Sequence, residues 1–460
     1  MQNMTQHASG DKEAIDEAAT SPFPITFFEA LKLWFKLGFL GFGGPAAQIA
    51  LMHRELVETR RWISEKRFLH ALNYCMLLPG PEAQQLATYM GWLMHRTWGG
   101  IAAGTLFLLP GLCFLITLSW IYIAYGDVSV VAGLFYGIKP AVTAVVFFAV
   151  YRIGSRVLKN NLMWLIAGAA FLAIFWLDVP FPLIVLVAAT SGYFGGRYYP
   201  DKFKVGGGHG AADKSYGPAL IDDNTPPPAH ARFRGRVLVQ VALAGALLWS
   251  VPMGILMSVY GWDHTLTQMG WFFTKAALLT FGGAYAVLPY LYQGVIGNYG
   301  WLTPTQMIDG LALGEANPGP LIMVVAFIGF VGGYVQALFG PELQFLAGAV
   351  AALLVTWFTF LPSFIFILGG GPIVESTHGN LKFTAPLTAI TAAVVGVILN
   401  LAVFFAYHVL WPEGLAEAFD WISAVLVVAS AIALLRYKRS VLQVIAASAI
   451  IGLALQTFVL

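Results

Sequence analysis

The sequence predicts an all-α polytopic membrane protein whose two homologous halves have inverted topology. Three observations lead to this fold class. Of the 460 residues, 58% are hydrophobic and only 10% are charged, whereas a soluble domain carries about 25% charged residues. Apolar stretches long enough to cross a ~30 Å hydrocarbon core recur along the chain. The two halves also share a repeat. A soluble protein with buried helices is disfavoured, because its surface would need charged residues that this chain lacks.

The chain divides into four segments by composition. Residues 1–24 are polar and acidic, lack the apolar stretch of a signal peptide and are predicted to be disordered. Residues 25–196 form the first repeat and residues 237–460 the second. Between them, residues 197–236 are rich in glycine, proline and charge, and are predicted to be a linker.

The repeat is carried by residues with special backbone roles. Residues 36–81 align without a gap with the segment 239 positions later (281 − 42), with 11 identities in 46 positions. Phe-Gly-Gly at 42–44 returns at 281–283, and Pro-Gly-Pro at 79–81 returns at 318–320. Identities concentrated on glycine, proline, tryptophan and lysine argue for duplication rather than chance.

Basic residues predict the orientation of the two halves. The loop after the first Phe-Gly-Gly holds five of them, which places it in the cytoplasm by the positive-inside rule. They are Arg54, Arg60, Arg61, Lys66 and Arg67. All five are replaced by uncharged residues in the second half, and the linker is again basic. The halves are therefore expected to lie inverted, as in many secondary transporters.

Each half should contain two broken, re-entrant helical segments and about four spanning helices. The re-entrant segments are expected at 26–52, 68–95, 269–291 and 307–337. The spanning helices are expected near 99–125, 130–151, 161–178, 181–196, 237–259, 345–368, 383–410, 420–435 and 441–459.

The candidate substrate site lies at the breaks. Irregular backbone at membrane depth is tolerated where it is buried in protein or lines a cavity. Proline directly after glycine suits the first turn of a helix, and a helix N-terminus offers free N–H groups to an anion. Packing corners without a ligand are the alternative interpretation. The candidate residues are Gly43, Gly44, Pro45, Pro79, Gly80, Pro81, Gln84, Gln85, Gly282, Gly283, Asn317, Pro318, Gly319 and Pro320.

Charged residues in apolar surroundings extend this site. Lys36 and Lys275 precede the two Phe-Gly-Gly motifs at equivalent positions. A cation inside the membrane is costly and usually functional, although a lysine can also extend to the interface. We expect the two lysines on either side of a central site. Glu82 either complements a helix dipole or binds a proton near the anion.

The basic loop offers a second candidate region. Arg54, Arg60 and Arg61 either only determine topology or gather anions at the cytoplasmic mouth. Trp62 and Trp301, which are repeat equivalents, are expected to be membrane-interface anchors.

Other chemistry has no recognisable motif. The chain lacks a P-loop, a His-Glu-x-x-His motif and a Cys-x-x-Cys motif. We therefore expect no metal, no cofactor, no nucleic-acid partner and no enzymatic activity.

These motifs together resemble those of the chromate ion transporter family, in its long two-domain form. The resemblance covers about residues 25 to 440. It is carried by the motifs at 42–45, 61–62, 78–87, 281–283, 300–303 and 317–320. Two positions depart from the first-half pattern, since Ala284 replaces the proline and Leu321 replaces the acid.

The resemblance implies a secondary transporter of the bacterial inner membrane that exports chromate and confers chromate resistance. The membrane potential would drive export, and proton coupling stays open. A sulfate or other oxyanion importer and an anion channel of the same fold are the alternatives, because chromate and sulfate are both tetrahedral dianions. The lipid bilayer is the other expected partner, and the sequence is compatible with a monomer or a homodimer.

Overall fold

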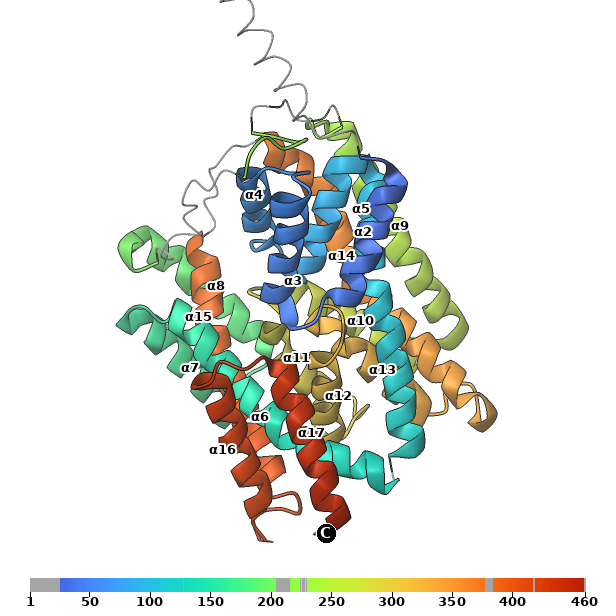
Figure 1. Ribbon diagram of the computed structural model, residues 1–460, viewed down its shortest axis with the longest axis vertical. Coiled ribbons are helices and arrows are strands. Elements are labelled where there is room, and N and C mark those ends of the chain that lie inside the picture. Colours follow the sequence, from blue (N-terminus) through green and yellow to red (C-terminus); the bar gives the residue numbers. More distant parts are fainter. Residues whose placement is uncertain are drawn as a thin grey trace, which may run out of the picture.

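The computed structural model describes residues 25–126, 128–203, 216–223, 225, 228, 230–376, 384–416 and 418–458. The predicted disorder of residues 1–24 lies outside the described residues. The described chain folds into helices, which confirms the all-α class. Figure 1 shows them packed side by side, with α2, α3 and α4 at one end and α16 and α17 at the other, while α5 extends from the first end toward the second.

The first half begins with short helices and continues with longer ones. They are α2 (Phe27–Leu40), α3 (Gly44–His53), the π-helix η1 (Arg54–Thr59), α4 (Glu65–Cys75), α5 (Glu82–Tyr125), α6 (Ser129–Val157), α7 (Asn161–Leu177), α8 (Phe181–Tyr198) and the short η2 (Pro200–Lys202).

The second half follows after α9 (Gly235–Tyr260), which has no counterpart among the described residues of the first half. It contains α10 (Thr265–Leu279), η3 (Ala284–Val287), α11 (Leu288–Tyr292), the π-helix η4 (Gln293–Asn298), α12 (Pro304–Glu315), η5 (Leu321–Met323), α13 (Val324–Val335), η6 (Pro341–Leu343), α14 (Gln344–Ser376), α15 (Thr384–Leu410), α16 (Trp421–Leu435) and α17 (Val441–Phe458).

The repeat found in the sequence extends to local backbone geometry. The π-helices η1 and η4 begin 239 positions apart (293 − 54), as do α4 and α12 (304 − 65) and the helix starts at Glu82 and Leu321 (321 − 82). A π-helix is rare and occurs frequently at functional sites. Its return at the same register shows that the duplicated segments keep an unusual conformation. The inverted orientation of the halves stays a prediction.

Helix α5 is a helical hairpin. His95 and Arg96 have non-helical backbone angles, and the chain turns back there. A Cβ built on Gly91 would lie 2.4 Å from the carbonyl oxygen of Gly99, and one on Gly99 would lie 2.2 Å from that of Gly91. Glycine is needed at both positions because the two arms touch through their backbones. The predicted boundary between segments 68–95 and 99–125 is therefore confirmed.

The second half contains the matching hairpin. Helix α13 ends at Val335, and α14 packs along it after a short connection. A Cβ on Gly333 would lie 2.7 Å from the carbonyl oxygen of Ala347. The first arms, from Glu82 and from Leu321, have about 13 to 15 residues and rise about 20 Å, which is less than a ~30 Å hydrocarbon core. This length agrees with a re-entrant segment.

The two halves interlock. Helix α6 of the first half packs against α16 and α17 of the second, and α15 of the second half packs against α7 and α8 of the first. In Figure 1, α16 and α17 lie beside α6, although their colours show that they are far from it in the sequence. Each half thus completes the helical packing of the other, and the largest apolar core contains residues from both.

Part of the predicted linker binds to the first repeat. Ile221 forms an isolated β-bridge with Ile63, and the Leu220 N–H donates to the Arg61 carbonyl oxygen at 3.0 Å. The Ser64 hydroxyl donates to Asp223 Oδ1 at 2.6 Å. This portion of the linker is therefore tied to the basic loop.

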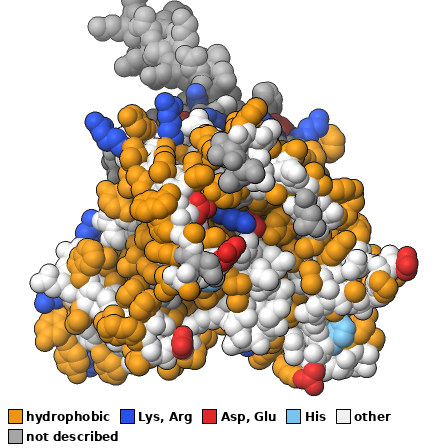
Figure 2. All heavy atoms as spheres, turned by 90° about the horizontal axis from the view of Figure 1, so that it is seen from below, with side chains coloured by type: hydrophobic (Ala, Val, Ile, Leu, Met, Phe, Trp, Pro, Cys, Tyr) orange, Lys and Arg blue, Asp and Glu red, His pale blue; other side chains and the backbone are white. Residues whose placement is uncertain are grey.

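The surface is that of a multi-pass membrane protein. Among the described residues, six helices are long and apolar enough to cross a membrane, and three shorter ones are apolar as well. Figure 2 shows hydrophobic side chains over both flanks of one face, with acidic and basic side chains meeting near its centre.

The expectation that Trp62 and Trp301 are interface anchors is wrong. The two side chains are only 5% and 4% exposed. Trp301 stacks on Tyr299 with ring centroids 4.4 Å apart, and Arg60 lies over the Trp62 ring at 5.0 Å. Both tryptophans fix the turn after a π-helix, which explains why they are shared by the repeats.

Candidate functional site

Breaks from the two halves meet in the structure. The Gly80 N–H of the first Pro-Gly-Pro donates to the Thr280 carbonyl oxygen, just before the second Phe-Gly-Gly, at 2.7 Å. A Cβ built on Gly283 would lie 3.9 Å from Glu82 Oε1. Gly80 and Gly283 have φ values of +124° and +102°, which L side chains rarely adopt. The glycines thus permit the two turns to come into contact.

The second Pro-Gly-Pro packs against the long arm of α5. A Cβ on Gly111 would lie 2.8 Å from the Pro318 carbonyl oxygen and 2.9 Å from Asn317 Nδ2. Gly111 follows Pro110, which lies inside the helix. Both Pro-Gly-Pro turns therefore touch a segment of the other half.

All four breaks are followed by a helix start. Helix α3 begins after Gly43, which has φ +91°, with Pro45 in its first turn. Helix α5 begins after Pro81, and η5 begins after Pro320. The second Phe-Gly-Gly leads into the 3-10 helix η3 instead of an α-helix. Ala284 stands at the start of η3, where the first half has Pro45 at the start of an α-helix.

Three buried amide side chains at the breaks are incompletely hydrogen-bonded. Gln84 Nε2 donates to Thr88 Oγ1 at 3.0 Å, and Gln85 Nε2 donates to the Pro79 carbonyl oxygen at 2.8 Å. Their Oε1 atoms have no partner, and both polar atoms of the Asn317 side chain lack one. A buried polar group without a partner costs about 1–3 kcal/mol, so such groups mark places where water or a ligand binds. Asn317 is the one of the three whose N–H donors are not already used.

The two repeat lysines have different surroundings. Lys36 is half exposed, and its Nζ lies 2.9 Å from Glu55 Oε1. This hydrogen bond holds the pKa of Glu55 below its usual value. Lys275 is partly buried and lies over the Trp271 ring at 5.6 Å. Among the described residues it has no carboxylate within ion-pair distance, and the ring that it contacts is exposed.

The arginines of the expected cytoplasmic mouth are engaged to different degrees. Arg60 pairs with Glu55 at 3.4 Å and with Glu29 at 3.6 Å. Arg54 and Arg61 are exposed. Arg61 has φ +52° and its carbonyl oxygen binds the linker. Arg54 and Arg61 are therefore the exposed arginines of this region, whereas Arg60 is paired with carboxylates.

The sequence analysis missed a set of charged contacts between the halves. Lys139 Nζ of α6 lies 3.8 Å from Asp309 Oδ2 of α12, and the Tyr122 hydroxyl donates to the same oxygen at 2.9 Å. Asp309 is only 2% exposed and its Oδ1 has no partner. The sequence did contain a signal for this contact, because a lysine and an aspartate both lie inside predicted membrane segments. Charged residues in such segments are functional candidates by default.

A second contact of this kind lies beside the breaks. The Tyr285 hydroxyl, two residues after Gly283, hydrogen-bonds Glu315 Oε1. Arg152 of α6 lies near enough to interact electrostatically with Glu315. Glu315 is followed closely by Asn317, so this contact connects the first half to the second Pro-Gly-Pro.

Comparison with known proteins agrees with this architecture. The family model described as chromate transporter matches residues 28–193 and 267–453. The chain belongs to the chromate transporter family. Both matched stretches contain a complete set of the breaks described above. No solved structure matches the chain.

Curated relatives share most of their length with the chain. A chromate transport protein of Pseudomonas aeruginosa is 33% identical, covering 87% of this chain and 89% of the relative. One from Cupriavidus metallidurans is 28% identical over 96% of both chains. An uncharacterized transporter of Methanocaldococcus jannaschii is 24% identical over 95% of both.

Proposed function

We propose that this protein exports chromate across the bacterial inner membrane as a secondary transporter. The observation that carries the proposal is the contact between the first Pro-Gly-Pro and the second Phe-Gly-Gly, in a chain of the chromate transporter family. Helix starts at membrane depth supply N–H groups and a partial positive charge for an oxyanion. Relatives named chromate transport proteins support chromate as the substrate.

The proposed site uses the backbone more than ionic side chains. The dianion binds N–H groups at the starts of α5 and η5, the free amide of Asn317 and the ammonium group of Lys275. Gln85 holds the first Pro-Gly-Pro turn through the Pro79 carbonyl oxygen. Gln84, which bonds Thr88 one turn along α5, completes the polar wall with it. Lys36, with Arg54 and Arg61, raises the local anion concentration on the cytoplasmic side. Alternating access arises when one half rocks against the other.

The membrane potential is sufficient to drive export. A dianion that leaves a cell with a negative interior gains about 2 × 2.3 kcal/mol per 100 mV. Uniport therefore needs no coupled proton, and Glu82 is the candidate carboxyl if protons are coupled.

The test is chromate uptake into inverted membrane vesicles with and without an imposed potential. Export predicts accumulation that is saturable and increases with an inside-positive vesicle potential. Sulfate in competition reports whether the site distinguishes the two dianions. Uptake only into right-side-out vesicles would show an importer, and a linear, non-saturating flux would show a channel.

A further inference from the structure

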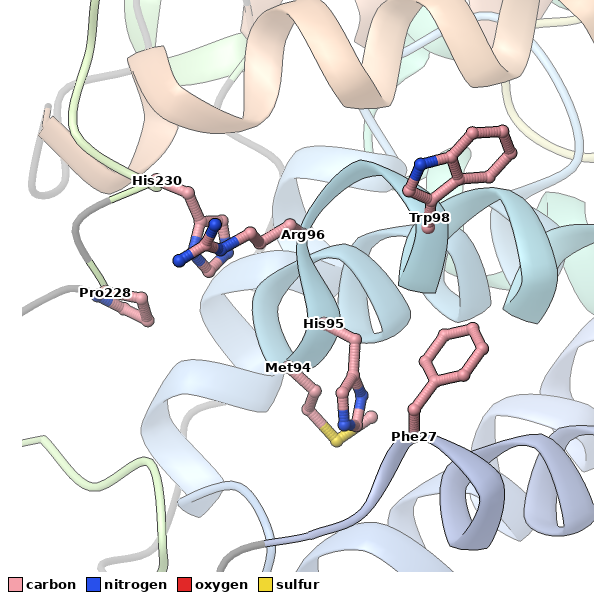
Figure 3. Close-up of a pocket in the computed structure, with 7 residues that line it drawn as sticks. All are labelled: Phe27, Met94, His95, Arg96, Trp98, Pro228 and His230. Carbon is pink, nitrogen blue, oxygen red and sulfur yellow. The ribbon is translucent and has the colours of Figure 1, made fainter.

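One cavity in the described part of the chain lies at the tip of the α5 hairpin, away from the breaks. It has a volume of about 760 Å³ and is lined by Phe27, Met94, His95, Arg96, Trp98, Pro228 and His230. Figure 3 shows that these side chains come from the start of α2, the hairpin tip and the linker, with Arg96 extending toward His230. Three separate segments thus form one open pocket.

Arg96 supplies the positive charge of this cavity. It is exposed and has no carboxylate within ion-pair distance among the described residues. Its φ of +56° is unusual for a residue other than glycine, and strained backbone of this kind clusters at functional sites. The hairpin turn therefore keeps an arginine where a glycine would fit the backbone better.

Both histidines of the cavity hydrogen-bond backbone carbonyl groups, so Arg96 is its fixed positive charge. His95 Nε2 hydrogen-bonds the Ile25 carbonyl oxygen at 3.1 Å, and His230 Nε2 hydrogen-bonds the Trp92 carbonyl oxygen at 2.9 Å. Burial, together with the nearby Arg96, lowers the pKa of His230, so its imidazole is neutral at pH 7. One positive charge matches a phosphodiester monoanion better than a dianion such as chromate.

The rim of the cavity is apolar and aromatic. Trp98 is 75% exposed, Phe27 is 43% exposed and the neighbouring Phe28 is 66% exposed. Exposed aromatic rings beside a cation are typical of the membrane–water interface. A small inorganic anion would not contact the aromatic rim or fill a volume typical of larger ligands. A lipid presents a phosphate for the cation and acyl chains for the rim.

We propose that this cavity binds the headgroup of an anionic phospholipid, with the phosphate on Arg96 and the acyl chains along Trp98 and Phe27. The bound lipid would join the α2 start, the α5 hairpin and the linker at the cytoplasmic interface. The linker is the connection between the halves, so lipid occupancy would stabilise their relative position. This proposal needs no assumption about the transported substrate.

The experiment measures lipid binding to the purified full chain in detergent. Dioleoyl phosphatidylglycerol, dioleoyl phosphatidylcholine and inorganic phosphate are added separately, and bound lipid is counted by native mass spectrometry alongside the thermal midpoint. We expect phosphatidylglycerol to bind and to raise the midpoint, with little effect of the other two. Arg96→Gln should weaken phosphatidylglycerol binding about fivefold, as expected for one arginine at an anionic surface.

Two further variants keep the test decisive. Arg96→Gly removes the charge while accepting the positive φ, so it should fold at least as well as the native chain and still lose the lipid. Arg234→Gln removes an exposed arginine outside the cavity and should bind as the native chain does. Native affinity in both Arg96 variants would overturn the proposal. An equal response to inorganic phosphate would overturn the lipid assignment and indicate a free-anion site.

Discussion

At the scale of single residues, unsatisfied polar groups distinguish the candidate site from ordinary membrane packing. Asn317 is 1% exposed, and neither polar atom of its side chain has a protein partner. Replacing such a group with an apolar one of similar shape is close to neutral or stabilising for a fold. A residue that weakens the fold is retained where it has another task, and the proposed function makes that task ligand binding for Asn317.

The Asn317→Leu substitution separates these two roles. We expect the thermal midpoint of the purified protein to stay level or rise, because an unpaired buried amide costing about 1–3 kcal/mol is removed. Chromate uptake should fall about tenfold or more, the effect of losing ~1.4 kcal/mol of binding. Thermal unfolding and vesicle uptake on the same preparation provide both values. Loss of stability together with uptake would instead assign Asn317 a structural role.

Glu82 allows a test of proton coupling at the same site. Its equivalent in the second half is Leu321, so a coupling role would belong to the first half alone. If its carboxyl exchanges a proton during transport, Glu82→Gln should flatten the pH dependence of uptake while chromate binding persists. Glu342→Gln, at a distant acid in η6, is the matched control. Uptake by Glu82→Gln with the native pH profile would exclude the coupling role.

At the scale of elements, the sequence predicted where helices break but not how the broken pieces pack. Gly-Gly and Pro-Gly-Pro restrict the local backbone conformation. The helix starts after Gly43 and Pro81 could therefore be predicted from the sequence. The residues at the hairpin turn, His95 and Arg96, are neither glycine nor proline, although Gly91 and Gly99 on either side permit the two arms to touch. Contacts such as Lys139 with Asp309 depend on long-range packing, which single-sequence periodicity does not encode.

The Lys139–Asp309 contact joins α6 to α12 and so joins the two halves. Removing one member of a buried pair leaves an uncompensated charge and costs about 3–5 kcal/mol, whereas replacing both with apolar residues is often tolerated. Asp309 is the buried member, at 2% exposure against 29% for Lys139. Lys139→Met alone should therefore destabilise the protein, and Asp309→Leu in the same chain should restore much of the thermal midpoint. A double-mutant cycle measures the coupling. Additive effects of the two substitutions would show that the pair is not energetically coupled.

The same cycle tests whether this pair matters for transport. A charge pair between two halves that rock would break and reform during alternating access. The double variant should then be stable but altered in the rate of chromate uptake. Native uptake by the stable double variant would leave the pair a purely structural contact.

At the scale of the whole molecule, duplication and exchange of helices explain why the breaks of the two halves meet. Each half covers the central helix of the other, since α16 and α17 pack on α6 while α7 and α8 pack on α15. Neither half can bury its own apolar surfaces without the other. The breaks are brought together by the same arrangement, so fold stability and the candidate site depend on one interface.

This interlock predicts how the protein behaves when the linker is cut. Two fragments, residues 1–210 and 211–460, should co-purify and restore chromate resistance when produced in the same cell, because the helix exchange and the linker contacts with Ile63 and Ser64 hold them together. Each fragment alone should be unstable, since it exposes the surfaces that its partner covers. Affinity purification through a tag on one fragment, with growth on chromate, checks both points. Cutting within α15 instead should abolish assembly, because this helix is central to the contact with α7 and α8. Fragments that are separately stable and fail to associate would contradict the interlocked architecture.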